Sequence, residues 1–568
     1  MKLKTLILVL FLPLLVSCTK NTGFVSASER NSSNPVSKNT DVSSDKQSGS
    51  ISGVNSTFGS DTSFDEKNTF YFDSESTSSL GTKEHPFSSL DSLSSIDFCK
   101  GTRVLFKRGS VFHGPLILKN LSGQENHPIV FSSYGEGDRP CFAPQDQRGK
   151  GVLYLKNCSY VSVSGLELTC LSKVEADRRG VLVELSSDSG SATYHDVVLN
   201  DLYIHDIYGY SDKENQGMSM ASKITGGVHL YSKDGNARMD GFTVKNCRIE
   251  NVSNVGVATW YKVDGTKVGK VSPYDESFKE KAHLNVLIQN NVISHVAKNA
   301  IFVRNLYKGL VSSNVVSYTS EVCKAGNSIV TSYVDSTIVE KNEGYLNLAT
   351  VQEDGKIQDG AMLDADLQSK DVVFQYNYSH DNAFGLFLNC NGQSSSDRGA
   401  NDVVTVRYNL SLCDKGKKGI VYINYYVGMV RFYNNTIITG KEDTPILIKV
   451  NNGRNACFYN NIFYVNSLSA SFELGDQKGL TMGKNLLFFK GSISGCNVDD
   501  FLRFDPIVRN SIPSDYVSLD KGIACAFFDN PEIYNASNCV KQDEVADILS
   551  SSYTIGLGCL NKNSNPIV

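Results

Sequence analysis

The 568-residue sequence lacks most of the signals that reveal a function directly. It has no block of basic residues, and 55 Lys and Arg against 60 Asp and Glu give a net charge of −5. Nucleic-acid binding therefore has no electrostatic support. After the first twenty residues, no stretch approaches the roughly 18 consecutive apolar residues of a transmembrane helix. The sequence has no GxSxG elbow, no HExxH motif and no Walker A loop.

Cysteine is present fourteen times, but in no recognisable arrangement. No CxxC pair and no metal-ligand spacing occurs, and setting Cys18 aside leaves an odd number. These features argue against a disulfide framework and a zinc site. We expect most cysteines to be small buried residues, and we expect no metal and no cofactor.

The N-terminus reads as a secretion signal. Lys2 and Lys4 precede about a dozen apolar residues, and small Ser17 precedes Cys18. The sequence "LVSC" resembles the lipobox of bacterial lipoproteins. That resemblance implies cleavage before Cys18 and lipid attachment to it, and so an envelope protein anchored to a membrane, most simply the outer membrane. We therefore predict a signal peptide over 1–18. Residues 19–66, rich in Ser, Asn and Thr, form a predicted flexible tether.

One sequence pattern recurs from residue 157 onward: residues that alternate as in a strand on both sides of an asparagine, as in "VVLNDLYI" and "FYNNTIIT". Successive asparagines lie 46, 45, 23, 28, 35, 32, 26, 26 and 24 residues apart. The minimum repeat is therefore 23 to 26 residues, with loops inserted in the longer units. Such a period indicates a solenoid, and the period-2 alternation indicates strands. The repeated asparagines are Asn200, Asn246, Asn291, Asn314, Asn342, Asn377, Asn409, Asn435, Asn461 and Asn485.

This pattern resembles the right-handed parallel β-helix proteins of the pectate-lyase-like superfamily. The resemblance includes the opening "GTRVLFKRGSVFHGPLIL" and covers most of the chain after the tether. It implies an all-β fold: a single right-handed parallel β-helix over residues 67–500 with an N-terminal cap, followed by a C-terminal cap over 501–568. The resemblance is specific for architecture but not for activity, because one fold hosts many functions.

The stretch "DGAMLDAD", residues 359–366, places acidic residues in one of the repeated strands. Alternation predicts that Ala361, Leu363 and Ala365 point inward, while Met362, Asp364 and Asp366 point outward. Asp359 precedes a glycine and is assigned to a turn. Stacking the same parity across the repeats predicts an outer column that suits a glycan lying along the sheet. Its members are Tyr231, Trp260, Arg304, Ser332, Asp364, Asn389, Asn424 and Lys449.

Asp364 and Asp366 lie two residues apart on one strand face, so their Cα atoms should be about 6.5–7 Å apart. A carboxylate pair at such a spacing suits glycoside hydrolysis, near the lower edge of the inverting range. We take Asp364 as the first choice of catalytic residue and Asp366 as its partner, with His380 in the next coil as a helper in proton transfer. Tyr231, Trp260, Arg304, Asn389 and Asn424 are predicted to bind the substrate.

Two alternatives stay open. The first is a polysaccharide lyase that holds calcium through clustered carboxylates such as Asp359, Asp364 and Asp366, with Arg304 or Lys449 as base or carboxylate clamp. The second is a non-catalytic adhesin or glycan-binding lipoprotein, which needs the aromatic column but not the acidic pair. All three interpretations predict a monomer that contacts a polysaccharide and, through its lipid anchor, a membrane.

Overall fold

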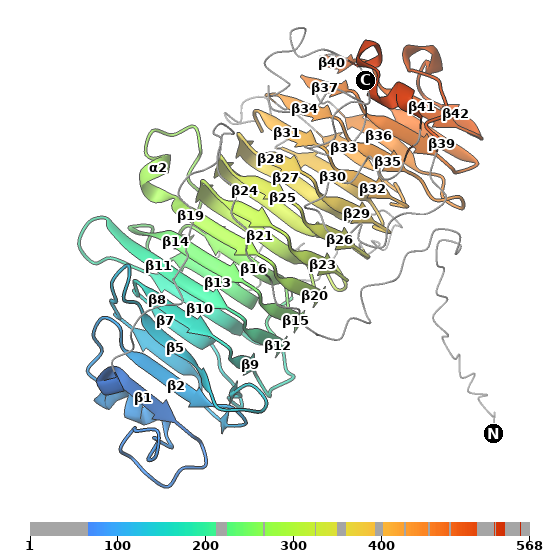
Figure 1. Ribbon diagram of the computed structural model, residues 1–568. Helices are drawn as coiled ribbons and strands as arrows, with labels where there is room; N and C mark the ends of the chain where they lie inside the picture. The colour runs from blue at the N-terminus through green and yellow to red at the C-terminus, as the bar shows by residue number, and fades with distance from the viewer. Residues whose placement is uncertain are drawn as a thin grey trace, which may run out of the picture.

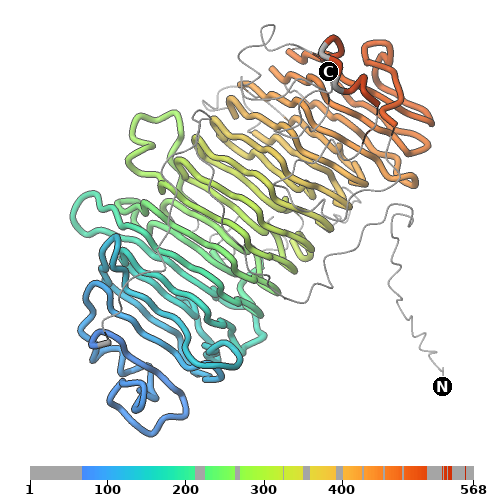
Figure 2. Tube along the Cα trace, in the orientation of Figure 1, coloured from blue at the N-terminus to red at the C-terminus, as the bar shows by residue number. Residues whose placement is uncertain are grey.

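The computed structural model describes residues 66–211, 224–264, 267–323, 325–348, 359–391, 401–424, 428–451, 455–475, 479–507, 528, 530–539 and 557. Parallel strands wind along one long axis in chain order, from the N-terminal strands to the C-terminal ones (Figure 1). The prediction of an all-β, right-handed parallel β-helix is confirmed. Figure 2 shows the same progression as a continuous coil from blue to red.

Each complete coil contributes one strand to each of three faces. We name them A, B and C because the chain passes from A to B, from B to C, and from C to the next strand of A. Faces A and B belong to one sheet of 27 strands, and face C is a separate sheet of 13 strands within the described residues. Face A consists of β4 (Leu116–Lys119), β7 (Gly151–Lys156), β10 (Arg179–Leu185), β13 (Gly226–Ser232), β16 (Val255–Trp260), β21 (Asn299–Tyr307), β24 (Ile329–Asp335), β27 (Ala361–Lys370), β30 (Gly385–Cys390), β33 (Val421–Asn424), β36 (Ile446–Asn451), β39 (Ser469–Glu473) and β42 (Ser492–Ser494).

The other two faces are built in the same way. Face B consists of β1 (Thr69–Phe72), β2 (Arg103–Lys107), β5 (Ile129–Tyr134), β8 (Val161–Ser164), β11 (Ala192–Asn200), β14 (Ala237–Lys245), β19 (His283–Gln289), β22 (Leu310–Ser312), β25 (Ile338–Glu340), β28 (Val373–Gln375), β31 (Val404–Arg407), β34 (Val430–Tyr433), β37 (Ala456–Tyr459) and β40 (Leu480–Met482). Face C consists of β3 (Val111–Phe112), β6 (Cys141–Phe142), β9 (Glu167–Thr169), β12 (Tyr203–Ile207), β15 (Arg248–Val252), β20 (Val292–Val296), β23 (Val315–Ser317), β26 (Glu343–Tyr345), β29 (Tyr378–His380), β32 (Leu410–Leu412), β35 (Thr436–Ile438), β38 (Ile462–Val465) and β41 (Leu486–Phe489).

Helical segments are few and short in the described residues. One α-helical turn occurs among the described residues, α2 (Phe278–Lys281), and it lies in an insertion that also carries the hairpin β17 (Val263–Asp264) and β18 (Lys267–Val268). The 3-10 turns are η2 (Glu66–Asn68), η3 (Leu90–Ser95), η4 (Val498–Asp500), η6 (Pro531–Tyr534) and η7 (Ala536–Asn538). None of these helices combines the length and the apolarity that a membrane span requires.

Alternation along the strands fills the interior of the coil. Inward Val, Ile, Leu and Phe side chains from all three faces form one continuous core that extends from Phe72 to Phe501. Each coil stacks its inner face on its neighbours, because no single coil could bury that face alone.

The repeated asparagines form a buried ladder at the corner between faces B and C. In each pair of rungs, the side-chain oxygen of one asparagine accepts from the backbone N–H and the amide of the asparagine one coil earlier. Asn377 Oδ1 accepts from Asn342 N and Nδ2, both at 3.0 Å, while Asn377 Nδ2 donates to Val339 O at 3.0 Å. The same pattern connects Asn291 to Asn485 through every intervening asparagine of the repeat.

Two predicted members of the repeat do not belong to this ladder. Asn246 is exposed, and its amide donates to Asn200 Oδ1 at 2.8 Å. The ladder position in that coil is Cys247, whose N–H donates to Asn291 Oδ1 at 2.9 Å. The sequence alignment of these early repeats was therefore wrong by at least one residue, because a β strand with a variable turn tolerates such offsets.

The two ends of the chain differ in how far they are described. At the N-terminal end, Phe72 of β1 packs against Phe87 and Phe106, which closes the first coil. The predicted signal peptide over 1–18 and nearly all of the tether lie outside the described residues, as does most of the predicted cap over 501–568.

Candidate functional site

The acidic strand β27 lies in face A, paired with β24 on one side and β30 on the other. Leu363 and Ala365 enter the main core, as predicted, so Asp364 and Asp366 lie on the outer side. The prediction for the start of the strand was wrong: Met362 packs into the main core, whereas Ala361 belongs to a small outer cluster with Phe384, Leu388 and Tyr422. The strand enters the face through a corner, so strict alternation begins only at Leu363.

The register corrects the predicted outer column. Arg304 pairs with Ser332, Ser332 with Asp366, Asp366 with Cys390, and Cys390 with Asn424. Asp366, and not Asp364, therefore occupies the column that contains Arg304 and Asn424. Neither Asn389 nor Lys449 belongs to that column.

Asp364 lies in a second, mostly apolar column. Its register neighbours on the two adjacent coils are Val330 and Leu388, both buried. The Asp364 side chain is consequently only 5% exposed, and burial raises the pKa of its carboxyl well above the usual value, with the Asp366 and Asp359 carboxyls adding to the shift. The expectation that Asp364 faces solvent was wrong.

Asn327, just before β24, holds the Asp364 carboxyl in place. Its Nδ2 donates to Asp364 Oδ2 at 2.7 Å, while its Oδ1 accepts from the backbone N–H groups of Gly360 at 3.0 Å and Ala361 at 2.8 Å. Asn327 is itself buried. From the sequence, Asn327 could be placed at the start of the repeat next to the acidic strand. The periodicity did not predict the direction of its side chain.

Asp359 belongs to the site, although the sequence assigned it to a turn. It is partly buried, its carboxyl raises the pKa of Asp364, and its own pKa is raised by burial against the opposing charges of Lys298 and Lys418. We name Asp359, Asp364 and Asp366 the acid cluster. The carboxyl groups of Asp359 and Asp366 both act electrostatically on that of Asp364.

Arg304 brings positive charge to the same column as Asp366. It is 7% exposed, its Nη1 donates to Ser332 Oγ at 3.2 Å, and its guanidinium lies 4.4 Å from the Tyr333 ring centroid. Burial lowers the pKa of Arg304, and Tyr333 and Asp366 oppose that shift. Within the part of the chain that the structure describes, its buried Nε has no hydrogen-bond partner. A guanidinium stays protonated under these conditions, so Arg304 favours the ionised form of Asp366.

Trp260 does not offer an exposed face to a sugar. It is 1% exposed, its indole N–H donates to His229 Nδ1 at 3.1 Å, and its ring stacks on Phe302 with centroids 5.2 Å apart. Tyr231 is partly buried beside the same apolar cluster and donates to Glu184 Oε2 at 3.0 Å. Ile224 packs in this cluster too, so the segment that enters β13 helps to cover the outer side of face A here. The prediction of an exposed Trp260 was wrong.

The two predicted asparagines differ from one another. Asn389 points into the core, is 0% exposed, and accepts from Asn401 Nδ2 at 3.1 Å, so its predicted outward orientation was wrong. Asn424 is partly exposed on the outer side of face A. Its Oδ1 accepts from Tyr422 OH at 2.9 Å and from Asn451 Nδ2 at 3.2 Å, which leaves a polar group two coils from Asp366.

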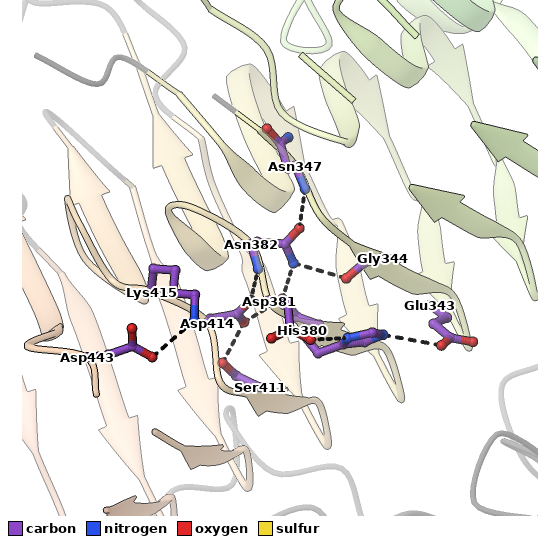
Figure 3. A network of polar contacts seen from close by, with 11 residues as sticks. Glu343, Gly344, Asn347, His380, Asp381, Asn382, Ser411, Asp414, Lys415 and Asp443 are labelled. Carbon is purple, nitrogen blue, oxygen red and sulfur yellow. Dashed lines mark hydrogen bonds and ion pairs between the residues drawn. The ribbon is translucent and has the colours of Figure 1, made fainter. Parts of the chain in front are cut away.

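His380 ends β29 in face C and is held by carboxylates of its own (Figure 3). Its Nδ1 lies 2.9 Å from Asp381 Oδ2 and its Nε2 lies 3.3 Å from Glu343 Oε1. Its ring stacks on those of Tyr345 and Tyr378, with centroids 4.7 and 4.5 Å apart. These hydrogen bonds raise the pKa of His380 to about 9 against the effect of burial. His380 thus belongs to an ion-pair network with Glu343 and Asp381 on face C, whereas the acidic strand β27 lies in face A.

The corner between faces C and A carries a second polar ladder, also shown in Figure 3. Asn382 Oδ1 accepts from Asn347 N, and Asp414 Oδ1 accepts from Asn382 N, both at 2.9 Å. Asn347 Nδ2 reaches Ala361 O at 3.5 Å, the first residue of β27. The start of the acidic strand is therefore held by the side chains of both Asn347 and Asn327. In the described residues, no group of three His, Cys, Asp or Glu side chains has an arrangement that could hold a metal ion.

Comparison with known proteins yields one curated relative and a matching fold. No model of a known protein family matches the chain. The chain is 25% identical over 458 residues to a lacto-N-biosidase of Bifidobacterium longum subsp. longum, a match that covers 67% of this chain and 28% of that protein. This chain thus spans little more than a quarter of the length of that relative.

The similar solved structures include a GH136 lacto-N-biosidase from Eubacterium ramulus. Its native structure has a TM-score of 0.52 and 19% identity, and the match covers 71% of this chain and 68% of that chain. The selenomethionine derivative gives a TM-score of 0.52 and 21% identity, with 74% and 67% covered. At these identities the structural similarity shows a shared β-helix fold. The curated protein that is similar in sequence is a glycosidase.

Proposed function

We propose that the chain is a glycoside hydrolase that cleaves a glycan at the acid cluster of face A. The observation that carries this proposal is the cluster itself: three carboxyl groups within eight residues at the start of β27, of which Asp359 and Asp364 have a raised pKa because of burial. Similarity to a lacto-N-biosidase over two thirds of the chain supports the same class of reaction.

Glycoside hydrolysis needs one carboxylic acid that keeps its proton and one carboxylate that is ionised. Asp366 suits the ionised role, because it is partly exposed and shares its column with the Arg304 guanidinium. Asp359 suits the acid role, because it is partly exposed and burial raises its pKa. Asp364 is close to both but almost inaccessible, so this assignment replaces Asp364 as the first choice of catalytic residue.

The substrate would lie along face A toward the C-terminal coils. On the N-terminal side of Arg304, the apolar cluster around Trp260 and Phe302 covers the outer surface. On the other side, Asn424 and Asn451 present amide groups in the Asp366 column. We propose Asn424 as a group that binds sugar hydroxyl or carbonyl oxygens, Arg304 as the buried cation beside Asp366, and Tyr231 as part of the wall.

The test is a hydrolysis assay on a chromogenic lacto-N-bioside and on a panel of neutral and acidic oligosaccharides. Asp359→Asn and Asp366→Asn should each lower kcat/KM at least about 100-fold on the substrate that is cleaved. Both variants should keep the free energy of unfolding within about 1 kcal/mol, since neither side chain is fully buried. Asp275→Asn, an exposed change in the insertion, is the matched control and should keep full activity. Full activity of Asp366→Asn would remove that residue from the mechanism.

The same panel distinguishes the two alternatives. A lyase would release a product with the ultraviolet absorbance of an unsaturated uronate and would lose activity with a chelator. A binding protein would retain oligosaccharides without producing new reducing ends. Either result would replace the hydrolase proposal.

A further inference from the structure

Asp364 has surroundings that no other member of the acid cluster shares. Its carboxyl lies between the apolar side chains of Val330 and Leu388 and is almost wholly removed from solvent. An ionised carboxylate in such a place would be costly unless a positive group paired with it. No ion pair to Asp364 occurs within 4.0 Å among the described residues, so the uncharged acid is the form that fits this site.

The hydrogen bonds of Asp364 specify which oxygen carries the proton. Oδ2 accepts from Asn327 Nδ2 at 2.7 Å, and Asn327 cannot present its oxygen to the same atom because that oxygen accepts from Gly360 N and Ala361 N. The other oxygen, Oδ1, is buried and has no hydrogen-bond partner among the described residues. A neutral carboxylic acid accepts through its carbonyl oxygen and donates through its hydroxyl. The proton therefore belongs on Oδ1.

Asn327 also connects this carboxyl to the backbone that carries Asp359. The two N–H groups that Asn327 Oδ1 accepts directly follow Asp359 in the chain. One buried amide thus fixes the position of the Asp364 side chain and the start of β27 together.

We infer that Asp364 is a positioning residue: an uncharged carboxylic acid that, with Asn327, holds the Asp359 backbone and the Asp366 strand in place without itself acting on the glycan. The part of this inference that concerns catalysis rests on the proposed function. The part that concerns the protonation and the stability of Asp364 does not.

The charged and titratable groups around Asp364 come from several elements. Asp359 and Asp366 are on its own segment, Cys390 is on β30, Lys418 precedes β33, and Lys298 precedes β21. Arg304 on β21 acts through Asp366. Because the two neighbouring carboxyls disfavour a further negative charge, a neutral Asp364 leaves Asp366 as the anion next to Arg304.

The decisive variant is Asp364→Asn, which imitates the neutral acid. Its amide oxygen can accept from Asn327, and its NH2 group replaces the Oδ1 hydroxyl as a donor. We expect kcat/KM within about threefold of wild type on the substrate that Asp366→Asn no longer cleaves, whereas Asp364→Leu should lose at least tenfold. A loss in Asp364→Asn as large as that in Asp366→Asn would overturn the positioning role.

A second measurement needs no substrate and so remains decisive if the hydrolase proposal fails. A carboxyl whose pKa is raised on folding stabilises the fold below its unfolded pKa of about 3.9 and loses that contribution as the pH rises toward the folded pKa. The melting temperature of Asp364→Asn minus that of wild type should therefore increase by about 2 °C or more as the pH rises from 4 to 7. Parallel curves for the two proteins would show that Asp364 is not held as the neutral acid.

Asn327 provides the matched test of the connection. Asn327→Ala removes both the donor to Asp364 and the acceptor for Gly360 and Ala361, and should lower kcat more than it raises KM. Asn327→Asp should be worse than Asn327→Ala at pH 7 and partly recover toward pH 4, because it places a carboxylate against Asp364. Equal pH dependence of the two Asn327 variants would contradict the inference.

Discussion

At the scale of single residues, Asp364 and Asp366 show how strongly adjacent coils decide the chemistry of one side chain. Both lie on the outer side of β27, two residues apart. Asp364 has Val330 and Leu388 beside it, whereas Asp366 has Ser332 and Cys390. The first pair of neighbours excludes water and the second leaves a partly exposed polar column. Two aspartates on the same strand thus differ in their access to water, and burial raises the pKa of the Asp364 carboxyl.

His380 provides a pH-dependent prediction at the same scale. Its pKa is about 9 in the folded protein and about 6.5 when unfolded, so the protonated ring stabilises the fold fully below pH 6.5. That contribution is lost as the pH rises from about 6.5 to 9, and we expect it to be roughly 2 kcal/mol. In denaturant unfolding, the His380→Gln protein should be less stable than wild type at pH 6, and this difference should be much smaller at pH 9.5.

The control for this prediction is His295→Gln. His295 is exposed and lies 3.1 Å from Glu321, so its ion pair is screened by water and should contribute less than about 0.5 kcal/mol. A His380→Gln protein with the same loss of stability at both pH values would show that ring stacking on Tyr345 and Tyr378, and not charge, accounts for the effect.

At the scale of elements, the asparagine ladder explains why the coils stay in register. Asn377→Ala should cost about 2–4 kcal/mol, because it leaves the buried Asn342 N–H and Val339 carbonyl without partners. Asn246→Ala is the matched control, since Asn246 is exposed and outside the ladder, and it should cost less than 1 kcal/mol. Urea unfolding of both variants measures the difference. Similar values for the two would mean that the ladder follows from the coil instead of stabilising it.

The same repeat shows what the sequence could and could not predict. The spacing of the asparagines and the alternation around them predicted a solenoid of strands and the outward direction of Asp364 and Asp366, and the resemblance to the pectate-lyase-like superfamily predicted the parallel β-helix. They did not fix how neighbouring coils align, because a shift of two residues preserves every inward and outward assignment. Asp364 was therefore stacked on Ser332, whereas Asp366 takes that place.

The sequence pattern could not predict which outward residues are buried by segments distant in the sequence. Trp260 has outward parity, but Phe302 and Ile224 pack in the same cluster and remove it from solvent. Asp359 precedes the strand, so the strand alternation makes no prediction for its side chain. Its position in the acid cluster depends on how the corner before β27 folds. Side-chain direction at corners is set by tertiary contacts, which a local repeat does not encode.

At the scale of the whole molecule, the β-helix divides its outer face A into distinct surfaces along the axis. The apolar cluster that contains Trp260 covers the earlier coils, the acid cluster follows on β27, and the polar side chains of Asn424 and Asn451 continue on β33 and β36. In Figure 1 these strands lie in the middle and C-terminal parts of the molecule. A continuous core beneath them keeps the three surfaces in one rigid row, which is the arrangement that an extended glycan would require.

The last prediction concerns where this row of surfaces acts. The segment "LVSC" predicts that Cys18 is lipidated after cleavage of the signal peptide, and two or more acyl chains on one residue are enough for stable membrane attachment. The full-length protein expressed in a bacterial host should therefore enter the detergent phase on Triton X-114 partitioning and sediment with membranes. Cys18→Ala should shift it to the aqueous phase, whereas Cys99→Ala, at an exposed cysteine of the folded part, should leave the partitioning unchanged. Partitioning of the wild-type protein into the aqueous phase would exclude lipid attachment at Cys18. Anchoring through Cys18 would place a glycan-cleaving face at the cell envelope, where polymeric substrates are accessible without transport.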